Sequence, residues 1–149
     1  MNVYDTIREL MKRKSQEIWS INPESSVYRA IELMADKHIG ALLVMEGDKL
    51  VGIISERDYA RKVILKGRSS KDTQVHEIMT TPVIFVQPQQ SVDECMRIMT
   101  DNRIRHLPVL ENEKVTGIVS IGDLVNWIMS AQDHTIQQLQ NYVTGKYPL

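Results

Sequence analysis

An internal duplication constrains the fold of this sequence more than any other feature. Pro23 aligns with Pro88, an offset of 65 residues, and the register then holds without a gap for 18–64 against 83–129. Because a repeat of this length corresponds to one supersecondary unit, the chain is expected to hold two copies of that unit. The identical pairs include Ser26/Ser91, Met34/Met99, Gly52/Gly117, Ser55/Ser120 and Asp58/Asp123.

Each copy predicts the element order β-α-β-β-α. Apolar residues at helical spacing after a serine cap predict an amphipathic helix, and short continuous apolar runs predict buried strands. Pro108 falls inside the core strand of the second copy, and it is expected at a sheet edge because proline donates no hydrogen bond to a ladder. In the first copy we expect strands at 18–21, 41–45 and 50–54, a helix from Val27, and a second helix over 57–66 ended by Gly67.

One copy is too small to bury a good core by itself, so the two copies are expected to share one core about a pseudo-twofold axis. The predicted fold class is therefore α/β (α+β), with two β-α-β-β-α repeats in one module and a helical extension at each end. The expected segments are an N-terminal helix at 1–17, the first repeat at 18–66, a linker at 67–74, the second repeat at 75–130 and a C-terminal extension at 131–149.

Each extension carries an apolar stripe at helical spacing. Such a stripe either docks on its own domain or mediates self-association, and we favour docking. Because the stripes lie outside the repeats, removal of residues 1–11 is expected to leave the repeats and a dimer intact. The stripes comprise Val3, Ile7, Leu10 and Met11 at the N-terminus and Ile136, Leu139 and Val143 at the C-terminus.

The composition argues against several classes of protein. Lys and Arg total 18 and Asp and Glu total 19, and this net charge of −1 argues against binding to nucleic acid or to anionic membranes. No apolar run approaches the ~20 residues of a membrane helix. Residues 1–14 do not resemble a signal peptide, and one cysteine cannot form an internal disulfide. We therefore expect a cytoplasmic protein in which Cys95 is a small buried thiol.

The motifs of common enzymes and metal sites are missing from the sequence. It has no Gly-rich nucleotide loop, no nucleophile elbow and no metal-ligand spacing among its four histidines. The protein is therefore expected not to be an enzyme, and to use neither a metal nor a catalytic cofactor.

One motif recurs in both copies where a strand passes into a helix. It reads Gly-Ile-Ile-Ser-Glu-Arg-Asp at 52–58 and Gly-Ile-Val-Ser-Ile-Gly-Asp at 117–123. The structural interpretation is a capping box, in which the serine accepts from the amide three residues on and the aspartate reaches back. The functional interpretation is a nucleotide site. There the helix start and serine favour a phosphate, the glycine leaves room for a ligand, and the aspartate accepts from a ribose diol. The repetition of Ser and Asp favours the functional interpretation, and both stay open.

Charge distinguishes the two copies. The first motif contains Arg57, which aligns with Gly122, while Arg105 and His106 stand where the first copy has two small residues. Because a phosphate forms charge-assisted hydrogen bonds with such cations, Arg57, Arg105 and His106 are candidate phosphate ligands. The site at the second motif is expected to select less strongly for phosphate.

The duplicated unit with these Ser-x-x-Asp motifs resembles a pair of cystathionine-beta-synthase (CBS) domains, of the small free-standing type. The similarity covers about 18–129, and 75–80 resembles the usual lead-in to such a repeat. The resemblance implies two clefts between the repeats that bind adenosine-containing ligands. These are AMP, ADP, ATP or NAD(H), with S-adenosylmethionine ranked behind them. The resemblance also implies a flat homodimer.

In this family each cleft combines the Ser and Asp of one repeat with the first strand, and the loop before the core strand, of the other. The resemblance therefore implies that the first cleft holds Ser55, Arg57, Asp58, Thr80, Val83, Ile104, Arg105 and His106. The second cleft then holds Ser120, Asp123, Ile18, Trp19, Ile39, Gly40 and Ala41.

The expected function is that of a regulatory module that senses energy or redox state through these ligands and passes the signal to a partner protein of unknown identity. A ligand-independent dimeric interaction scaffold is the alternative. Neither nucleic acid nor a membrane is an expected partner.

Overall fold

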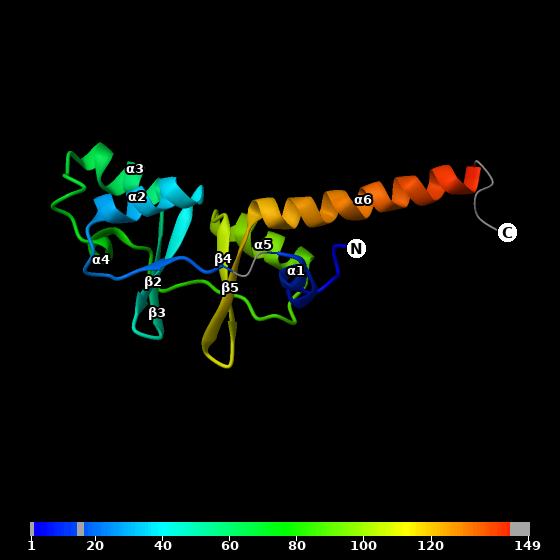
Figure 1. Ribbon diagram of the computed structural model, residues 1–149, viewed down its shortest axis with the longest axis horizontal. Helices are drawn as coiled ribbons and strands as arrows, with labels where there is room; N and C mark the ends of the chain where they lie inside the picture. Colours follow the sequence, from blue (N-terminus) through cyan, green and yellow to red (C-terminus); the bar gives the residue numbers. More distant parts are fainter. Residues whose placement is uncertain (1, 15–16, 144–149) are drawn as a thin grey trace. The chain divides into compact units, whose positions relative to one another are not determined.

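The computed structural model describes residues 2–14 and 17–143, and beyond Ser130 it describes the side chains of Gln137, Leu139 and Gln140 only. Packing divides the chain into two compact units (Figure 1). The first-repeat unit comprises 17–85 and 112–116, and the second-repeat unit comprises 1–16, 86–111 and 117–149. Across the described ranges, the helices are all too short or too polar to cross a membrane.

The first-repeat unit contains the full predicted order of elements. These are β1 (Ser20–Ile21), α2 (Val27–Lys37), β2 (Ala41–Glu46), β3 (Lys49–Ser55) and α3 (Glu56–Lys62). The strands form one sheet in the order β1-β2-β3, in which β1 is parallel and β3 antiparallel to β2. The mixed α/β class and the β-α-β-β-α order are therefore confirmed in this unit.

The second helix of this repeat is shorter than predicted. It ends at Lys62, and Val63 follows as its C-cap (φ −116°, ψ −69°) with its side chain completely buried. A 3-10 turn, η1 (Ile64–Lys66), follows, and Gly67 ends it in the left-handed conformation with φ of 66°. The predicted role of Gly67 is thus correct, but it caps the 3-10 turn rather than a continuous helix.

The second-repeat unit has the same order with a weaker first strand. It contains α5 (Val92–Asn102), β4 (His106–Glu111), β5 (Lys114–Ser120) and α6 (Ile121–Val143). The segment 83–86 makes one isolated parallel bridge, Val86 with Val109, instead of a strand. In the first repeat the Leu43 amide donates to Trp19, and Pro108, at the position equivalent to Leu43, has no N–H to donate. The sheet of β4 and β5 has two strands, so Pro108 lies in an edge strand of it, while the Val86 amide donates to the Pro108 carbonyl at 3.0 Å.

Two short helices, here called lead-ins, each precede one repeat in the sequence and pack on the other repeat. The lead-in α1 (Ile7–Arg13) belongs to the second-repeat unit, and α4 (Val75–Ile78), which precedes the second repeat in sequence, belongs to the first-repeat unit. The Ile7 amide donates to Gln90 at 2.8 Å, and the Val75 amide donates to Ser25 at 2.8 Å. The two lead-ins therefore occupy equivalent places on opposite repeats.

Each lead-in completes the core of the unit on which it packs. Ile7 and Leu10, which are 0% and 3% exposed, pack with the core of the second-repeat unit. Val75 and Ile78 enter the core of the first-repeat unit in the same way. The predicted docking of the N-terminal stripe is confirmed. The burial of Ile7 and Leu10 predicts, against the expectation from sequence, that removal of residues 1–11 opens this core.

Cys95 lies in the core of the second-repeat unit with no exposed surface. Burial raises the pKa of its thiol to about 12, so the sulfur stays protonated at neutral pH. The prediction of a small buried thiol is confirmed.

The C-terminal extension is not a separate element, because α6 continues without a break from Ile121 to Val143. Figure 1 shows its second half continuing past α1 and α5 of the same unit. Leu139 is 62% exposed, so the predicted docking of the C-terminal stripe is not found at that residue. The side chains of Ile136 and Val143 lie outside the described residues.

A pair of leucine substitutions tests the structural role of the lead-in. Leu10→Ala should lower the free energy of unfolding by about 2–5 kcal/mol, because it removes a buried side chain and leaves a cavity. Leu65→Ala makes the same chemical change at a residue that is 75% exposed, and it should cost less than about 0.5 kcal/mol. Urea unfolding followed by circular dichroism measures both values. Equal, small effects of the two substitutions would show that α1 is not part of the core.

Candidate functional site

The first Ser-x-x-Asp motif forms a capping box at the start of α3. The Ser55 hydroxyl accepts from the Asp58 amide at 3.1 Å, and the Asp58 Oδ2 accepts from the Ser55 amide at 2.9 Å. The Ser55 hydroxyl also donates to Oδ2 at 3.1 Å. The structural interpretation of the motif is thus correct, and the box fixes the position of the carboxylate.

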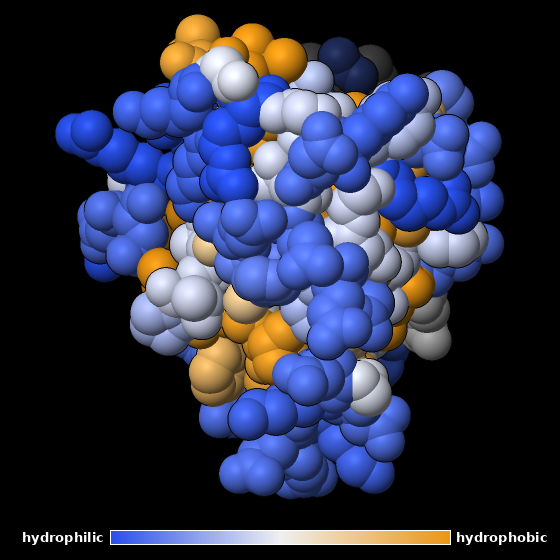
Figure 2. Space-filling view, turned by 90° about the vertical axis from the view of Figure 1, so that its left-hand side faces the viewer, coloured by the Kyte–Doolittle hydropathy of each residue, from blue (hydrophilic) through white to orange (hydrophobic). Residues whose placement is uncertain are grey.

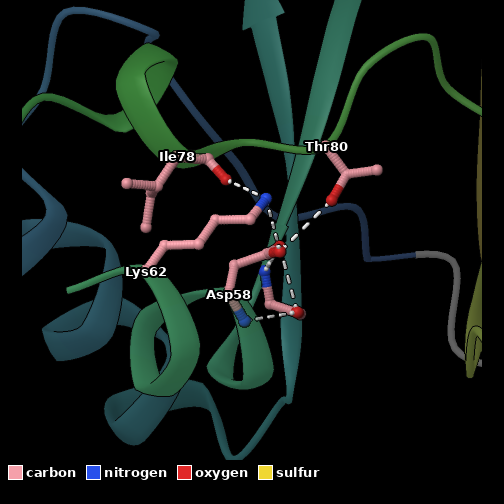
Figure 3. Close-up of polar contacts among 5 residues, drawn as sticks. Asp58, Lys62, Ile78 and Thr80 are labelled. Atoms are coloured by element: carbon pink, nitrogen blue, oxygen red, sulfur yellow. Dashed lines mark hydrogen bonds and ion pairs between the residues drawn. The ribbon is translucent and has the colours of Figure 1, made fainter. Parts of the chain in front are cut away.

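The second carboxylate oxygen of Asp58 has two further donors (Figure 3). The Thr80 hydroxyl donates to Oδ1 at 3.2 Å, and the Lys62 ammonium lies 3.1 Å from the same oxygen. Lys62 also donates to the Ile78 carbonyl at 2.8 Å, which ties α3 to α4. Both oxygens of Asp58 therefore accept hydrogen bonds within the first-repeat unit.

The second Ser-x-x-Asp motif repeats this geometry at the start of α6. The Asp123 Oδ2 accepts from the Ser120 amide at 2.8 Å, and the Ser120 hydroxyl accepts from the Asp123 amide at 3.1 Å. The cation on this carboxylate comes from elsewhere in the sequence. Lys14, which directly follows α1, places its Nζ 2.6 Å from Oδ2 and also donates to the Ile118 carbonyl.

The glycine of each motif makes room for a methionine. A Cβ atom at Gly52 would lie 2.4 Å from the Met79 sulfur, and one at Gly117 would lie 2.0 Å from the Met11 methyl carbon. Met79 directly follows α4, and Met11 lies in α1. The expectation that these glycines leave space for a ligand is therefore wrong, because the lead-ins fill that space.

Strand pairing places the start of each core strand beside the Ser-x-x-Asp motif of the same repeat. Ala41 pairs with Ser55, and the Gly40 carbonyl accepts from the Glu56 amide at 3.0 Å. In the other unit the Arg105 carbonyl accepts from the Ile121 amide at 2.9 Å. Arg105 thus stands beside the second motif. The Asp123 motif thus has Arg105 and Lys14 on neighbouring segments of its own unit, and the expected combination of Arg57 with Arg105 and His106 stays a prediction.

His106 is a neutral rather than a cationic candidate. Burial lowers the pKa of His106 below its ordinary value of 6.5, and the positive charges of Lys14 and Arg105 lower it further against the opposing charge of Asp123. At neutral pH the ring therefore carries no charge, which corrects its expected role as a cation for phosphate.

The remaining predicted site residues take several positions. Trp19 packs against the core of the first-repeat unit and lies 4.3 Å from the Lys37 ammonium. Ile39 packs against the same core, and Ile104 packs against the core of the second-repeat unit. Arg57 and Val83 are half-buried and Ile18 is exposed, all within the first-repeat unit. The predicted residues thus fall into two sets, one in each unit.

Sequence reasoning missed the two lysines that contact the aspartates. The spacing of Lys62, four residues after Asp58 on a helix, is a signal that could have revealed the first pair. Lys14 has no such signal, because its partner lies 109 residues away. Within the ranges that the structure describes, no cluster of His, Cys, Asp and Glu could hold a metal ion.

The low pKa of His106 predicts a loss of stability in acid. In the unfolded chain the His106 ring takes up a proton near pH 6.5, whereas in the folded protein it stays neutral to a lower pH. The free energy of unfolding should therefore fall as the pH drops through and below the unfolded value. The His106→Gln variant should lose less stability between about pH 7.5 and pH 5 than the wild type. Urea unfolding at both pH values measures this, with His38→Gln as the control for loss of one histidine. An equal loss in wild type and His106→Gln would contradict the assignment.

Comparisons with known proteins agree on the family. A model of the CBS domain matches residues 7–65 and 75–130. The mitochondrial CBS domain-containing protein CBSX3 of Arabidopsis thaliana is 41% identical over an alignment of 152 positions. The alignment covers 95% of this chain and 73% of that protein.

Solved structures show the same fold. A CBS-domain protein from Burkholderia ambifaria, described as a candidate for signal transduction, is 52% identical with a TM-score of 0.84, over 86% of this chain and 96% of that chain. The CBS domain pair of protein MJ0100, solved with 5-methylthioadenosine and S-adenosylmethionine, is 24% identical with a TM-score of 0.76, over 86% of this chain and 98% of its own. This chain belongs to the CBS domain family and contains a tandem pair of CBS domains.

Proposed function

We propose that this protein is a non-catalytic regulatory module that binds adenosine-containing ligands, AMP, ADP, ATP or NAD(H), at its two Ser-x-x-Asp motifs. The observation that carries the proposal is the repeated placement of one carboxylate. Asp58 and Asp123 are fixed by the same capping box at the same strand-to-helix junction in two separate cores. Helix capping alone does not require the same acidic residue at both sites, so its repetition supports a shared ligand.

The chemistry of each motif suits a nucleoside. A carboxylate accepts hydrogen bonds from both hydroxyls of a ribose, and dinucleotide-binding folds use an acidic residue in this way. Lysine and arginine near each carboxylate suit a phosphate on the same ligand. The two ligands solved with the MJ0100 domain pair both carry an adenine nucleoside with sulfur at its 5′ carbon, which supports an adenosine-containing ligand class.

The proposed site residues keep the roles suggested by the family resemblance. Asp58 and Asp123 would bind ribose, and Ser55, Ser120, Arg57 and Arg105 would lie near phosphate. The apolar and small residues would surround the base. They are Ile18, Trp19, Ile39, Gly40, Ala41, Val83 and Ile104, while Thr80 and the neutral His106 would complete the polar contacts.

Regulation would follow from a population shift. A ligand that binds one arrangement of the protein more tightly than another favours that arrangement by its difference in affinity. We further propose a homodimer that passes this change to a partner protein in the cytoplasm.

A ligand-independent dimeric scaffold is the second candidate, and one observation favours it. Both carboxylates already pair with lysines inside their own units, so neither needs a ligand to satisfy its charge. Exposed apolar side chains also offer surface for association, and Figure 2 shows such side chains at the upper edge of an otherwise largely hydrophilic face. The exposed apolar residues include Ile64, Leu65, Met129 and Leu139.

Calorimetric titration with AMP, ATP, NADH and S-adenosylmethionine distinguishes the two candidates. At least one ligand should bind the wild type. The double variant Asp58→Asn, Asp123→Asn should bind that ligand about tenfold or more weakly, because hydrogen bonds to a charged acceptor are lost. Asparagine keeps an acceptor for the cap, so folding should persist.

The Ser91→Ala variant is the matched control. It removes a cap on α5, where the Ser91 hydroxyl accepts from the Glu94 amide at 3.1 Å, without touching either motif. It should lower stability and leave ligand affinity unchanged. The scaffold would be favoured if none of the four ligands binds and the aspartate variants keep the oligomeric state of the wild type.

A further inference from the structure

The ion pair between Lys14 and Asp123 is unlike its counterpart in the other unit. Lys62 and Asp58 are neighbours on one helix, whereas Lys14 reaches Asp123 from a segment 109 residues away. The side chains of Lys14 and Asp123 are 24% and 25% exposed, so water screens this pair only partly. A contact of this kind between distant segments is not a by-product of helix geometry.

Several contacts hold the N-terminal segment in the position that delivers Lys14. The Trp127 indole donates to the Asp5 carboxylate at 3.1 Å, and Arg8 pairs with Glu111 at 2.8 Å. Trp127 aligns with Lys62 of the first repeat, so the second repeat has lost its local lysine. The N-terminal segment thus supplies to Asp123 the cation that the first repeat supplies to Asp58 from its own helix.

The two carboxylates also differ in their remaining capacity for hydrogen bonds. Thr80 and Lys62 both occupy Oδ1 of Asp58. On Asp123, Lys14 and the Ser120 amide share Oδ2, and no described residue donates to Oδ1. One oxygen of Asp123 can therefore accept from a ligand hydroxyl while Lys14 stays within a few ångströms of that ligand.

The first turn of α6 is exposed at Gly122, next to this carboxylate. Gly122 replaces Arg57 of the first motif, and a Cβ atom there would meet only the Ser120 hydroxyl, at 3.5 Å. With no side chain at this position, an anionic group can approach the first turn of α6, within reach of a lysine whose charge is otherwise matched by one carboxylate.

We propose that Lys14 is a ligand-binding residue of the Asp123 motif and gives that motif its preference for a phosphorylated over an unphosphorylated nucleoside. This inference rests on the proposed function, and it adds a residue from the N-terminal lead-in to the site. When a ribose hydroxyl bonds to Asp123, the Lys14 ammonium contacts the phosphate of the same ligand. The expectation from sequence placed phosphate selectivity at the first motif, and the contact of Lys14 with Asp123 extends it to the second.

Nuclear magnetic resonance titration tests the proposal at this site alone, with the Gly122 amide signal as the reporter. AMP and adenosine are titrated into the wild-type protein and into Lys14→Met, which keeps the apolar stem of the side chain. The wild type should bind AMP more tightly than adenosine. The dissociation constant for adenosine divided by that for AMP should fall about tenfold in Lys14→Met, because AMP binds more weakly. Adenosine affinity should not fall, because the substitution also frees Asp123.

Two further variants serve as controls. Lys14→Arg keeps the charge and should retain most of the preference for AMP. Lys12→Met removes a neighbouring exposed lysine and should leave the ratio unchanged. An unchanged ratio in Lys14→Met, or an equal loss of affinity for both ligands, would overturn the role of Lys14 alone. A wild-type protein in which neither ligand moves the Gly122 signal would instead count against the proposed function at this motif.

Discussion

The docking of each lead-in helix onto the opposite repeat is the interaction on which the rest of the structure depends. A single β-α-β-β-α repeat leaves one side of its core uncovered, and Ile7 with Leu10 in one unit, or Val75 with Ile78 in the other, covers it. Main-chain hydrogen bonds fix the position of each lead-in, so the apolar contacts occur in one register. The core of the second-repeat unit is therefore built from segments distant in the chain, and the core of the first-repeat unit uses the segment that leads into the second repeat.

The same docking builds the surroundings of the candidate sites. Met79 and Met11 fill the space above the two motif glycines. The chain just beyond each methionine then reaches an aspartate, through Thr80 in one unit and Lys14 in the other. A change at either aspartate can therefore act on a lead-in, and through it on the core that the lead-in completes. This connection offers a physical route from ligand binding to a structural response.

Much of this arrangement could be predicted from the duplication. The strand order, the serine caps, the capping boxes and the edge position of Pro108 all follow from local patterns that the repeat shows twice. The lead-ins were harder to place, because they correspond at an offset of 68 residues (Met11 with Met79) rather than 65. The six residues 12–17 stand where the second repeat has only 80–82. This insertion conceals the correspondence, and with it the role of Lys14. The charge near the Asp123 motif was underestimated, because Lys14 reaches it from a segment 109 residues away and no local pattern reveals that contact.

Native-state hydrogen exchange of the Ile7 and Val75 amides tests the crossed docking most directly. Each amide donates to the opposite repeat, Ile7 to Gln90 and Val75 to Ser25, and neither partner lies in the same helix. If the lead-ins complete the cores, both amides should exchange with a free energy of opening close to that of core strand amides such as Val119. Exchange of Ile7 or Val75 at the rate of a frayed terminus, while Val119 stays protected, would contradict the account.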